Sequence, residues 1–231
     1  MYNIKLVLNI YILKNKNFKF IKGDVSNATE LKKKVLKIKK IDYLWLLAAN
    51  SDIRKGTNNR LVDLQNTFLT NYTSLKLFKK KLKKNGTVVF SSSSAVYGKN
   101  DKKFKEDQKR FLPESNYGES KLISEIYIKK FCIINKIKYL IIRYPNVVGK
   151  PFTHGVIFDL AKKINNNKIL KVLGNGNQKK PYAHVKEIIQ CMYYLINKKK
   201  LSYNTYLVGP RGDGTKVKTI VNTLKKYFKM K

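Results

Sequence analysis

The sequence predicts an α/β fold in which helices cover both faces of a parallel β-sheet, and two observations support this prediction. Short apolar runs alternate in regular order with segments of helical periodicity, and such alternation is typical of consecutive βαβ units. The 231 residues include 43% hydrophobic side chains, among them 15 Tyr and 11 Phe. This apolar content is high enough to bury a core, so we expect a folded globular protein rather than a disordered chain.

Six apolar runs are interpreted as β-strands because they are short and strongly apolar. In chain order they are IKLVLNIYIL at 4–13, FKFI at 18–21, DYLWLLAA at 42–49, TVVFSS at 87–92, KYLIIRY at 138–144 and NTYLVG at 204–209. Lys5 and Asn9 interrupt the first run, which is too short to cross a bilayer and lacks a small-residue cleavage site. We interpret it as a buried strand of a cytoplasmic protein without a membrane span.

Helix-like segments separate these runs, at residues 28–40, roughly 60–82, 117–135, 156–164, 185–196 and 215–228. No internal repeat or low-complexity linker divides the chain. After Gly149, however, the irregular polar segments PFTHG and GNGNQKKPY are typical of a smaller substrate-binding lobe. We therefore predict a sheet domain at 1–149 and a smaller lobe at 150–231 that is interleaved with the sheet.

The chain carries 50 Lys and Arg residues against 14 Asp and Glu, a net charge of +36. Such a charge favours nucleic acid or another polyanion as a partner. The lysines are nevertheless spread from Lys5 to Lys231 without one dominant block, alongside many Asn, Ile and Tyr. All four residue types have A/T-rich codons, so genome composition explains the excess, and we expect no specific nucleic-acid partner. Salt-sensitive, sequence-independent binding to polyanions is still expected.

The cysteines and histidines indicate no metal site. Cys132 and Cys191 are the only cysteines, no CxxC motif is present, and His154 and His184 lie far apart. The sequence therefore predicts neither a zinc site nor a disulfide framework, and it favours a reducing compartment.

Three polar residues fall just after predicted strands, namely Asn50, Ser93 and Asn146. Ligands of open parallel sheets bind at the carboxyl ends of the strands, so these segments should converge on one site. Tyr117 and Lys121 lie four positions apart on a predicted helix and therefore share a face. A phenol with a pKa near 10 is a weak base at neutral pH, but a cation one turn away favours the phenolate, and Ser93 could bind the same substrate hydroxyl.

Taken alone, Tyr-x-x-x-Lys is a weak signal in a chain so rich in both residues, and the wider context carries more weight. The motifs VFSSSSAVYG, YGESKLISE, IIRYPNVVG and VLGNGNQKKPYAHV occur in this order. In this arrangement the chain resembles the extended short-chain dehydrogenase/reductase family, also called the NAD-dependent epimerase/dehydratase family. It is most similar to nucleotide-sugar epimerases of the UDP-glucose 4-epimerase type. The resemblance runs from about Lys19 to Phe228. It implies a Rossmann-like doubly wound sheet, NAD as cofactor, a UDP-hexose as substrate and a homodimer as a further expectation.

The resemblance also implies roles for individual residues. Ser93, Tyr117 and Lys121 correspond to the catalytic set, and Lys121 also holds the nicotinamide ribose. The segments FIKGDVSN and LLAANSDIRKG resemble those that contact the adenine and that pass under the pyrophosphate and ribose. The residues implied in cofactor binding are Asp24, Val25, Ala48, Ala49, Asn50 and Lys121.

Substrate contacts are implied for Ser93, Asn146, His154 and Lys180. His154 either lines the sugar-nucleotide pocket or caps the next helix. Lys180 stands where the family usually has Arg, and it keeps the charge for phosphate without the bidentate geometry. Tyr97 either shapes the sugar pocket or packs beside the turn. For His184 a packing role is favoured.

The two residues after Ser93 separate the reactions of this family. Dehydratases usually carry Asp-Glu there as an acid/base pair, whereas Ser94 and Ala95 cannot eliminate water. Epimerisation needs no further acid, because hydride leaves C4, the keto sugar turns over and hydride returns to the other face. The resemblance thus implies an isomerase of carbohydrate metabolism, a nucleotide-sugar 4-epimerase.

The main departure from the family pattern lies at the start of the chain. Family members open with a strand, a Gly-x-x-Gly-x-x-Gly loop and a helix, whose N–H groups hold the cofactor pyrophosphate. Here the first sixty residues contain only Gly23 and Gly56, and GPRGDG at 209–214 is interpreted as a plain turn. We therefore expect a sheet that lacks its first Gly-rich βα unit and a partial substrate lobe, truncated at both ends relative to the family. Further along, Asn66 is expected to take the place of a structural asparagine.

Three functions remain open on this basis. The first is a nucleotide-sugar epimerase, weakened by truncation, that in its complete form retains NAD through the reaction. The second is a catalytically silent fragment or partner subunit of the same family. A polyanion-binding protein that uses the basic surface is the least favoured.

Overall fold

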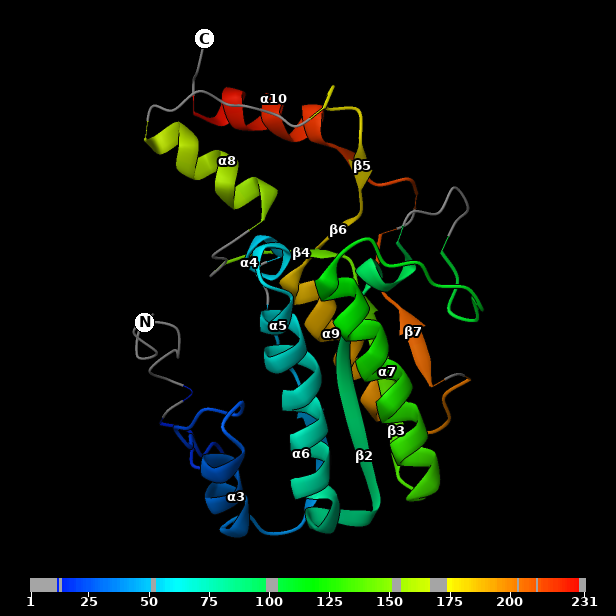
Figure 1. Cartoon of the computed structure of the whole chain (residues 1–231). Helices are drawn as coiled ribbons and strands as arrows, with labels where there is room; N and C mark the ends of the chain where they lie inside the picture. The colour runs from blue at the N-terminus through cyan, green and yellow to red at the C-terminus, as the bar shows by residue number, and fades with distance from the viewer. Residues whose placement is uncertain are drawn as a thin grey trace.

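A four-stranded sheet with the order β1-β2-β3-β7 lies at the centre of this computed structural model (Figure 1). Its strands are β1 (Ile41–Leu46), β2 (Leu82–Ser93), β3 (Lys138–Tyr144) and β7 (Thr205–Leu207). All three neighbouring pairs are parallel, which confirms the predicted α/β class. The structure describes residues 12, 14–50, 53–98, 104–150, 155–166, 174–202, 204–210 and 212–228.

Helices connect the strands. α3 (Ala28–Leu36) precedes β1. Between β1 and β2 the chain forms α4 (Ile53–Asn58), α5 (Arg60–Asp63), the π-helix η1 (Leu64–Leu69), α6 (Thr70–Phe78) and the 3-10 turn η2 (Lys79–Lys81). The 3-10 turn η3 (Ser94–Tyr97) and α7 (Asn116–Ile134) follow β2, and α9 (Val185–Asn197) precedes β7.

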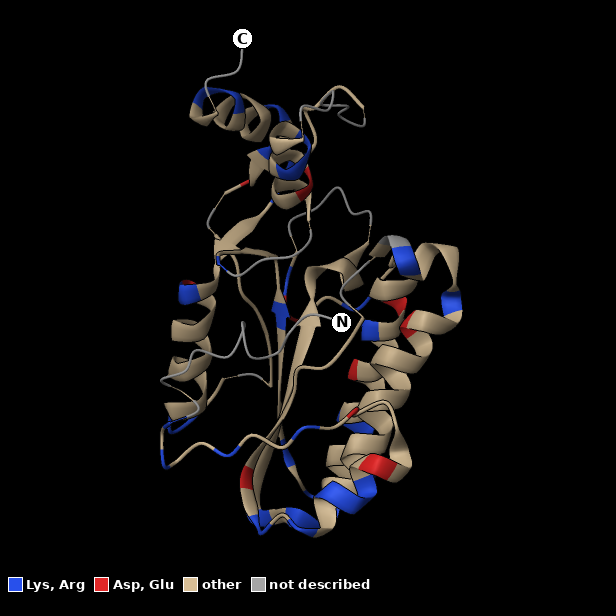
Figure 2. Cartoon of the chain, turned by 90° about the vertical axis from the view of Figure 1, so that its left-hand side faces the viewer, with Lys and Arg blue, Asp and Glu red and all other residues tan. Residues whose placement is uncertain are grey.

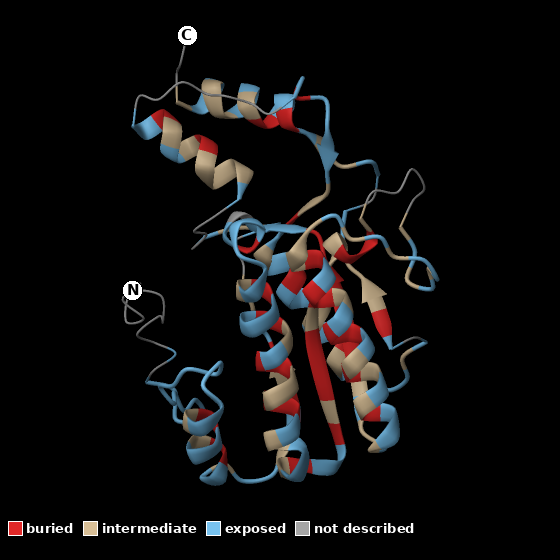
Figure 3. Ribbon diagram, viewed as in Figure 1, coloured by how far each residue is buried: buried red, intermediate tan, exposed pale blue. Residues whose placement is uncertain are grey.

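The sheet has an apolar core on each face. On one face, Leu75 of α6 and Ile128 of α7 belong to the same buried cluster as Phe90 of β2. On the other face, Ile188 of α9 is buried in a second cluster with Ile142 of β3. Successive residues of a strand point to opposite faces, so these central strands are buried on both sides. Figure 3 shows their buried positions running through the middle of the sheet.

The strand predicted at 18–21 is wrong. These residues have no regular secondary structure, and Phe18, Phe20 and Ile21 remain 39%, 46% and 41% exposed. A strand requires a neighbour that takes up its backbone hydrogen bonds. β1 is the edge of the described sheet and pairs only with β2 there, and residues 18–21 lie instead in an exposed segment before α3.

The helix predicted at roughly 60–82 is present but changes its winding. Its middle is the π-helix η1, and two side chains bond to backbone carbonyls there. The Thr70 hydroxyl donates to the carbonyl of Gln65 at 3.0 Å, and the Asn71 amide donates to that of Thr67 at 2.7 Å. Short π-helical segments inside α-helices are frequent at functional sites, and this one lies beside the carboxyl end of β1.

A smaller group of elements lies beyond the carboxyl end of the sheet (Figure 1). It contains two short pairs, the parallel β4 (Asn146–Val148) with β6 (Tyr182–His184) and the antiparallel β5 (Lys179–Lys180) with β8 (Thr215–Lys216). The helices α8 (Val156–Asn165) and α10 (Val217–Tyr227) pack on each other there. Residues after 149 also form β7, a strand of the main sheet, and α9, which packs against that sheet. The domain boundary at residue 149 stays a prediction.

The opening run at 4–13 falls almost entirely outside the described residues, so its assignment as a strand stays a prediction. Within the described part of the chain, no helix combines the length and the apolar character that crossing a membrane requires.

Candidate functional site

The carboxyl ends of β1, β2 and β3 meet at one end of the sheet (Figure 1). Asn50 follows β1, Ser93 ends β2 and Asn146 begins β4 just after β3. α7 begins at the same end, with Tyr117 in its first turn and Lys121 in its second. The fold thus gathers at one edge the segments that the sequence predicts to converge there.

Ser93 occupies an extended position at the end of β2, with φ −142° and ψ 150°. Its hydroxyl accepts a hydrogen bond from the Ala95 N–H at 3.1 Å and so caps the short helix η3. Gly118 of α7 lies directly against this turn, because a Cβ at Gly118 would be 2.6 Å from the Ala95 carbonyl oxygen. A glycine at this position lets α7 approach the Ser93 turn closely.

Tyr117 is positioned by two hydrogen bonds of its neighbours. The Ser115 hydroxyl caps α7 by accepting from the Gly118 N–H at 3.1 Å, and the Asn116 amide donates to the carbonyl of Gly56 at 3.0 Å. Burial raises the pKa of Tyr117, hydrogen bonding with Ser93 lowers it in part, and the charge of Asp63 adds to the increase. Ser93 and Tyr117 therefore interact directly, although the phenol by itself is held in its neutral form.

Lys121 is buried, with only 2% of the residue exposed. Its ammonium donates to the Ser91 carbonyl at 2.6 Å and lies 4.9 Å from the centre of the Phe90 ring and 5.8 Å from that of Tyr117. Burial lowers the pKa of Lys121 to about 8, against the opposing charge of Glu125. A lysine in this state stays cationic at neutral pH and faces the tyrosine whose phenolate it could stabilise.

Asn50 is fixed by two residues that the sequence does not single out. Its backbone N–H donates to the Thr67 hydroxyl at 3.2 Å, and its side-chain amide donates to Asp63 Oδ1 at 2.7 Å. Thr67 and Asp63 are buried, whereas Asn66, which was expected to take a structural place, is exposed. The only sequence signal for these two residues was the polar stretch near Asn66. A regular α-helical period does not predict which residues of that stretch are buried, because part of it is a π-helix.

Asp63 is 1% exposed, and its second carboxylate oxygen, Oδ2, has no hydrogen-bond partner. Gly56 lies against this oxygen, because a Cβ at Gly56 would be 1.7 Å from it. The neighbouring residues for which the resemblance implies cofactor binding differ in exposure, with Ala48 exposed and Ala49 half-buried. Among the described residues no group of three or more His, Cys, Asp or Glu side chains could hold a metal ion.

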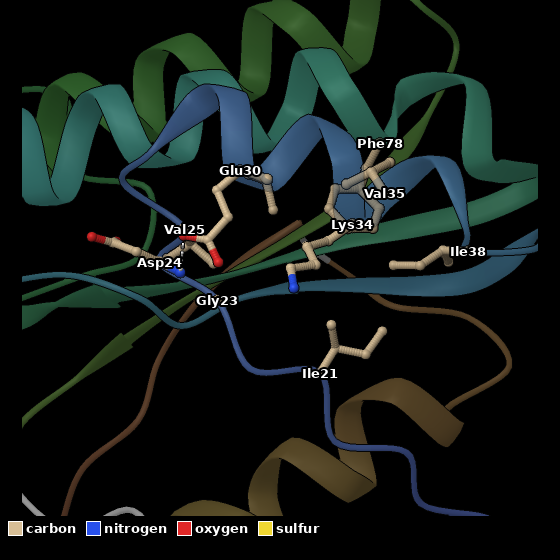
Figure 4. Close-up of a pocket in the computed structure, with 10 residues that line it drawn as sticks. Ile21, Gly23, Asp24, Val25, Glu30, Lys34, Val35, Ile38 and Phe78 are labelled. Carbon is tan, nitrogen blue, oxygen red and sulfur yellow. Dashed lines mark hydrogen bonds between the residues drawn. The ribbon is translucent and has the colours of Figure 1, made fainter.

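Asp24 and Val25 line a separate pocket at the start of α3 (Figure 4). The Asp24 carboxylate accepts from the Ser26 N–H at 2.8 Å and from its hydroxyl at 2.7 Å, and these bonds lower the pKa of Asp24. The pocket has a volume of about 170 Å³, and apolar side chains such as Ile21, Ile38 and Phe78 form much of its wall.

The substrate residues implied by the resemblance are not all brought together. The Asn146 amide donates to the Pro181 carbonyl at 3.0 Å, which ties the start of β4 to the residue before β6. Lys180 is exposed on β5, opposite Thr215 of β8, within the group of elements beyond the sheet. His154 lies outside the described residues, so its role stays a prediction.

Two open assignments are decided by contacts. Tyr97 is 1% exposed, and its hydroxyl donates to the Lys105 carbonyl at 2.8 Å and accepts from Arg143 at 2.9 Å, so it packs beside the turn. His184 is exposed and caps α9, because its Nδ1 accepts from the Lys186 N–H at 3.2 Å; it therefore has a capping role in place of the expected packing role.

Comparisons with known proteins identify the family of this chain. The sequence model of the NAD dependent epimerase/dehydratase family matches residues 5–209. A putative UDP-glucose 4-epimerase from Methanocaldococcus jannaschii is 27% identical over 214 residues, which cover 91% of this chain and 67% of that protein. A dTDP-D-glucose 4,6-dehydratase from Dictyostelium discoideum is 26% identical over 211 residues, 86% of this chain and 48% of that protein.

The fold is also found in solved structures. The UDP-glucuronic acid 4-epimerase from Bacillus cereus, solved with UDP-glucuronic acid and NAD, matches 96% of this chain and 69% of its own, with a TM-score of 0.82 and 24% identity. The chain thus spans between about half and about two thirds of the length of these proteins. Because the family match extends over most of the sequence, the chain belongs to the NAD dependent epimerase/dehydratase family.

Proposed function

We propose that this chain carries the proton-transfer set of an NAD-dependent nucleotide-sugar 4-epimerase that acts on UDP-hexoses. The observation that supports this most is the proximity of Ser93, Tyr117 and Lys121. Ser93 interacts with the Tyr117 phenol, and the Lys121 ammonium lies 5.8 Å from the Tyr117 ring centre. A hydroxyl donor, a phenolic base and a nearby cation are the groups needed to remove a proton from a sugar hydroxyl.

In the proposed reaction Tyr117 accepts the proton of the sugar 4-hydroxyl, and Ser93 donates a hydrogen bond to the same oxygen. The Lys121 ammonium stabilises the Tyr117 phenolate before it takes up this proton and after it gives the proton back. When bound, NAD would accept the hydride from C4 and return it to the opposite face. Tyr117 then returns its proton to the 4-oxygen. The side chains of Ser94 and Ala95 offer no acid for loss of water, which favours epimerisation over dehydration.

The residues that are present fit the two ends of a dinucleotide. Asp24 and Val25 border an apolar pocket of about 170 Å³ that suits a flat heteroaromatic ring, and Lys121 would hold the ribose hydroxyls at the other end. Ala48, Ala49 and Asn50 follow the carboxyl end of β1. The 231 residues contain no Gly-x-x-Gly-x-x-Gly segment, and such a segment supplies most of the N–H groups that bind pyrophosphate. We therefore expect this chain by itself to bind NAD weakly.

The proposal is tested by incubating the chain with NAD and UDP-glucose or UDP-glucuronate and separating the 4-epimers by chromatography. Tyr117→Phe should lower turnover by about a hundredfold or more, because the proton acceptor is lost. Tyr193→Phe removes a hydroxyl from an exposed ring on α9 and should leave turnover unchanged. Conversion that persists in Tyr117→Phe would rule out the assigned role.

A catalytically silent relative is the second candidate, and a specific observation favours it. The Lys121 ammonium is bonded to the Ser91 carbonyl, and burial raises the pKa of the Tyr117 phenol. Calorimetric titration with NAD separates the two candidates. Absence of binding at millimolar cofactor, together with absence of epimer formation, would favour the silent relative.

A further inference from the structure

A buried ion pair lies directly behind the Ser-Tyr-Lys set and joins three elements. Arg143 of β3 donates to Glu125 of α7 through Nε at 2.9 Å and through Nη2 at 2.7 Å. Both residues are 1% exposed. The Ser92 hydroxyl of β2 donates to the same carboxylate at 2.6 Å. Both carboxylate oxygens are thus bonded to buried donors, which a buried charge requires.

The ion pair is connected to the set through two adjacent residues of β2. Ser92 precedes Ser93, and Ser91 accepts from the Lys121 ammonium at 2.6 Å. Lys121 and Glu125 lie one helical turn apart on α7. Successive residues of β2, directly before Ser93, are therefore tied to successive turns of α7.

We propose that Glu125 and Arg143 are positioning residues for the Ser93, Tyr117 and Lys121 set. Arg143 orients the Glu125 carboxylate, which holds Ser92 and thereby the end of β2, and which places its negative charge one turn from the Lys121 ammonium. The inference rests on the proposed function for its catalytic meaning, whereas the linkage between Glu125 and Lys121 can be measured without activity.

Several charged groups face this region from the packed elements. On α7, Glu125 opposes the effect of burial on the pKa of Lys121, and the Lys129 ammonium lies 3.9 Å from the Glu125 carboxylate. Arg143 of β3 forms an ion pair with the same Glu125 carboxylate. From α5, the Asp63 charge acts on Tyr117. Glu125→Gln removes a negative charge that acts on Lys121, so the lysine should lose its proton at lower pH.

The first experiment measures unfolding by denaturant from pH 6 to 10, with and without Lys121→Met. The pKa of Lys121 is about 8 in the folded chain and about 10.4 when unfolded. Below pH 8 Lys121 is protonated in both the folded and the unfolded state, and burial of its charge lowers the free energy of unfolding. Above pH 8 the folded state releases the proton first, so the stability gained from Lys121→Met declines as the pH rises.

In the Glu125→Gln background this decline should begin at a pH lower by about half a unit or more. Lys129→Gln is the matched control, because it removes a half-buried charge near the same carboxylate, and the decline should stay near pH 8. An unchanged onset in Glu125→Gln would overturn the electrostatic part of the proposal, whether or not the chain is an epimerase.

The second experiment separates positioning from stability. Glu125→Gln should lower kcat about tenfold or more, with little change in KM, because the set is misplaced rather than the substrate site. The double variant Glu125→Leu with Arg143→Met replaces the ion pair by apolar side chains, which often restores stability. Its melting temperature should recover while kcat stays low. Recovery of kcat together with the melting temperature would show that the pair is only structural. If the unmodified chain has no turnover, the proposed function fails, and the pH experiment alone decides the linkage.

Discussion

The candidate site depends on a few buried groups whose ionisation differs from that in water. Burial lowers the pKa of Lys121 to about 8 and raises that of Tyr117. Both shifts have the same cause, since desolvation disfavours the charged form of either group. A Tyr117 phenolate and a Lys121 ammonium can therefore coexist only if each charge stabilises the other. The Lys121 ammonium lies 5.8 Å from the Tyr117 ring centre, which is close enough for such stabilisation.

At this scale Gly56→Ala should destabilise the fold. The new methyl group would be 1.7 Å from Asp63 Oδ2 and 2.6 Å from its Cγ, so Asp63 would have to turn away from the Asn50 amide that it accepts from. We expect a loss of about 1–3 kcal/mol in the free energy of unfolding, measured with urea. Gly155→Ala meets no atom within 4 Å but has a φ of +98°, and serves as a control for backbone strain alone. A Gly56→Ala variant as stable as the parent chain would contradict the contact.

Cys132 should be unreactive in the folded chain. Burial raises the pKa of the Cys132 thiol to about 12, so almost no thiolate exists at pH 8, and the thiolate is the reactive form. Cys191 is only partly buried and should react first. Alkylation with iodoacetamide at pH 8, followed by peptide mass analysis, should label Cys191 faster, while denaturant should equalise the two rates. Faster labelling of Cys132 in the native chain would argue against this packing.

At the scale of elements, short capping motifs determine where the helices that cover the sheet begin. The His184 N–H donates to the Glu187 carboxylate at 2.7 Å, while the His184 ring accepts from the Lys186 N–H. This reciprocal arrangement is a capping box at the start of α9, the helix that carries Ile188 and Leu195 into the second core. The end of β6 is therefore joined to the helix without a loop.

Glu187→Ala should lower the free energy of unfolding by about 0.5–1 kcal/mol, because the backbone N–H of His184 loses its partner. Thermal unfolding followed by circular dichroism measures the effect. Lys186→Ala on the same exposed first turn is the control and should change the melting temperature much less. His184→Ala combined with Glu187→Ala should cost less than the sum of the two single variants, because they share one motif. Full additivity would show that the two bonds act independently.

At the scale of the whole molecule, the positive charge is distributed rather than concentrated. Figure 2 shows Lys and Arg on α10 at one end of the molecule and on the turn before β2 at the opposite end. A net charge of +36 creates a field that attracts any polyanion, and that attraction carries no sequence information.

Binding to random duplex DNA should accordingly weaken about a thousandfold or more between 50 and 200 mM salt. No sequence should be preferred, because the contacts are with phosphates. Fluorescence anisotropy with several unrelated duplexes measures both properties. A preference of about a hundredfold for one duplex at physiological salt would instead identify a specific nucleic-acid partner.

The sequence by itself determined the central strands, the long helices and the face that Tyr117 and Lys121 share. KYLIIRY was predicted at the residues that form β3, and α7 differs from its prediction by one residue at each end. These features depend on local periodicity, because the spacing of residues along one helix or strand already defines which of them share a face. The order of the four sequence motifs likewise indicated the family without any information about tertiary contacts.

Only the tertiary structure decided which distant residues meet. FKFI has the composition of a strand but no neighbour to pair with, so it stays exposed. Glu125 and Arg143 lie 18 positions apart, and Asn50 and Asp63 lie 13 apart. Their contacts depend on the register between elements. Asn50 is also bonded to Thr67, which lies in a π-helical segment that a regular helical period does not predict. Periodicity within one element contains no information about such contacts, because strand pairing and helix packing bury these groups only when the whole sheet has formed.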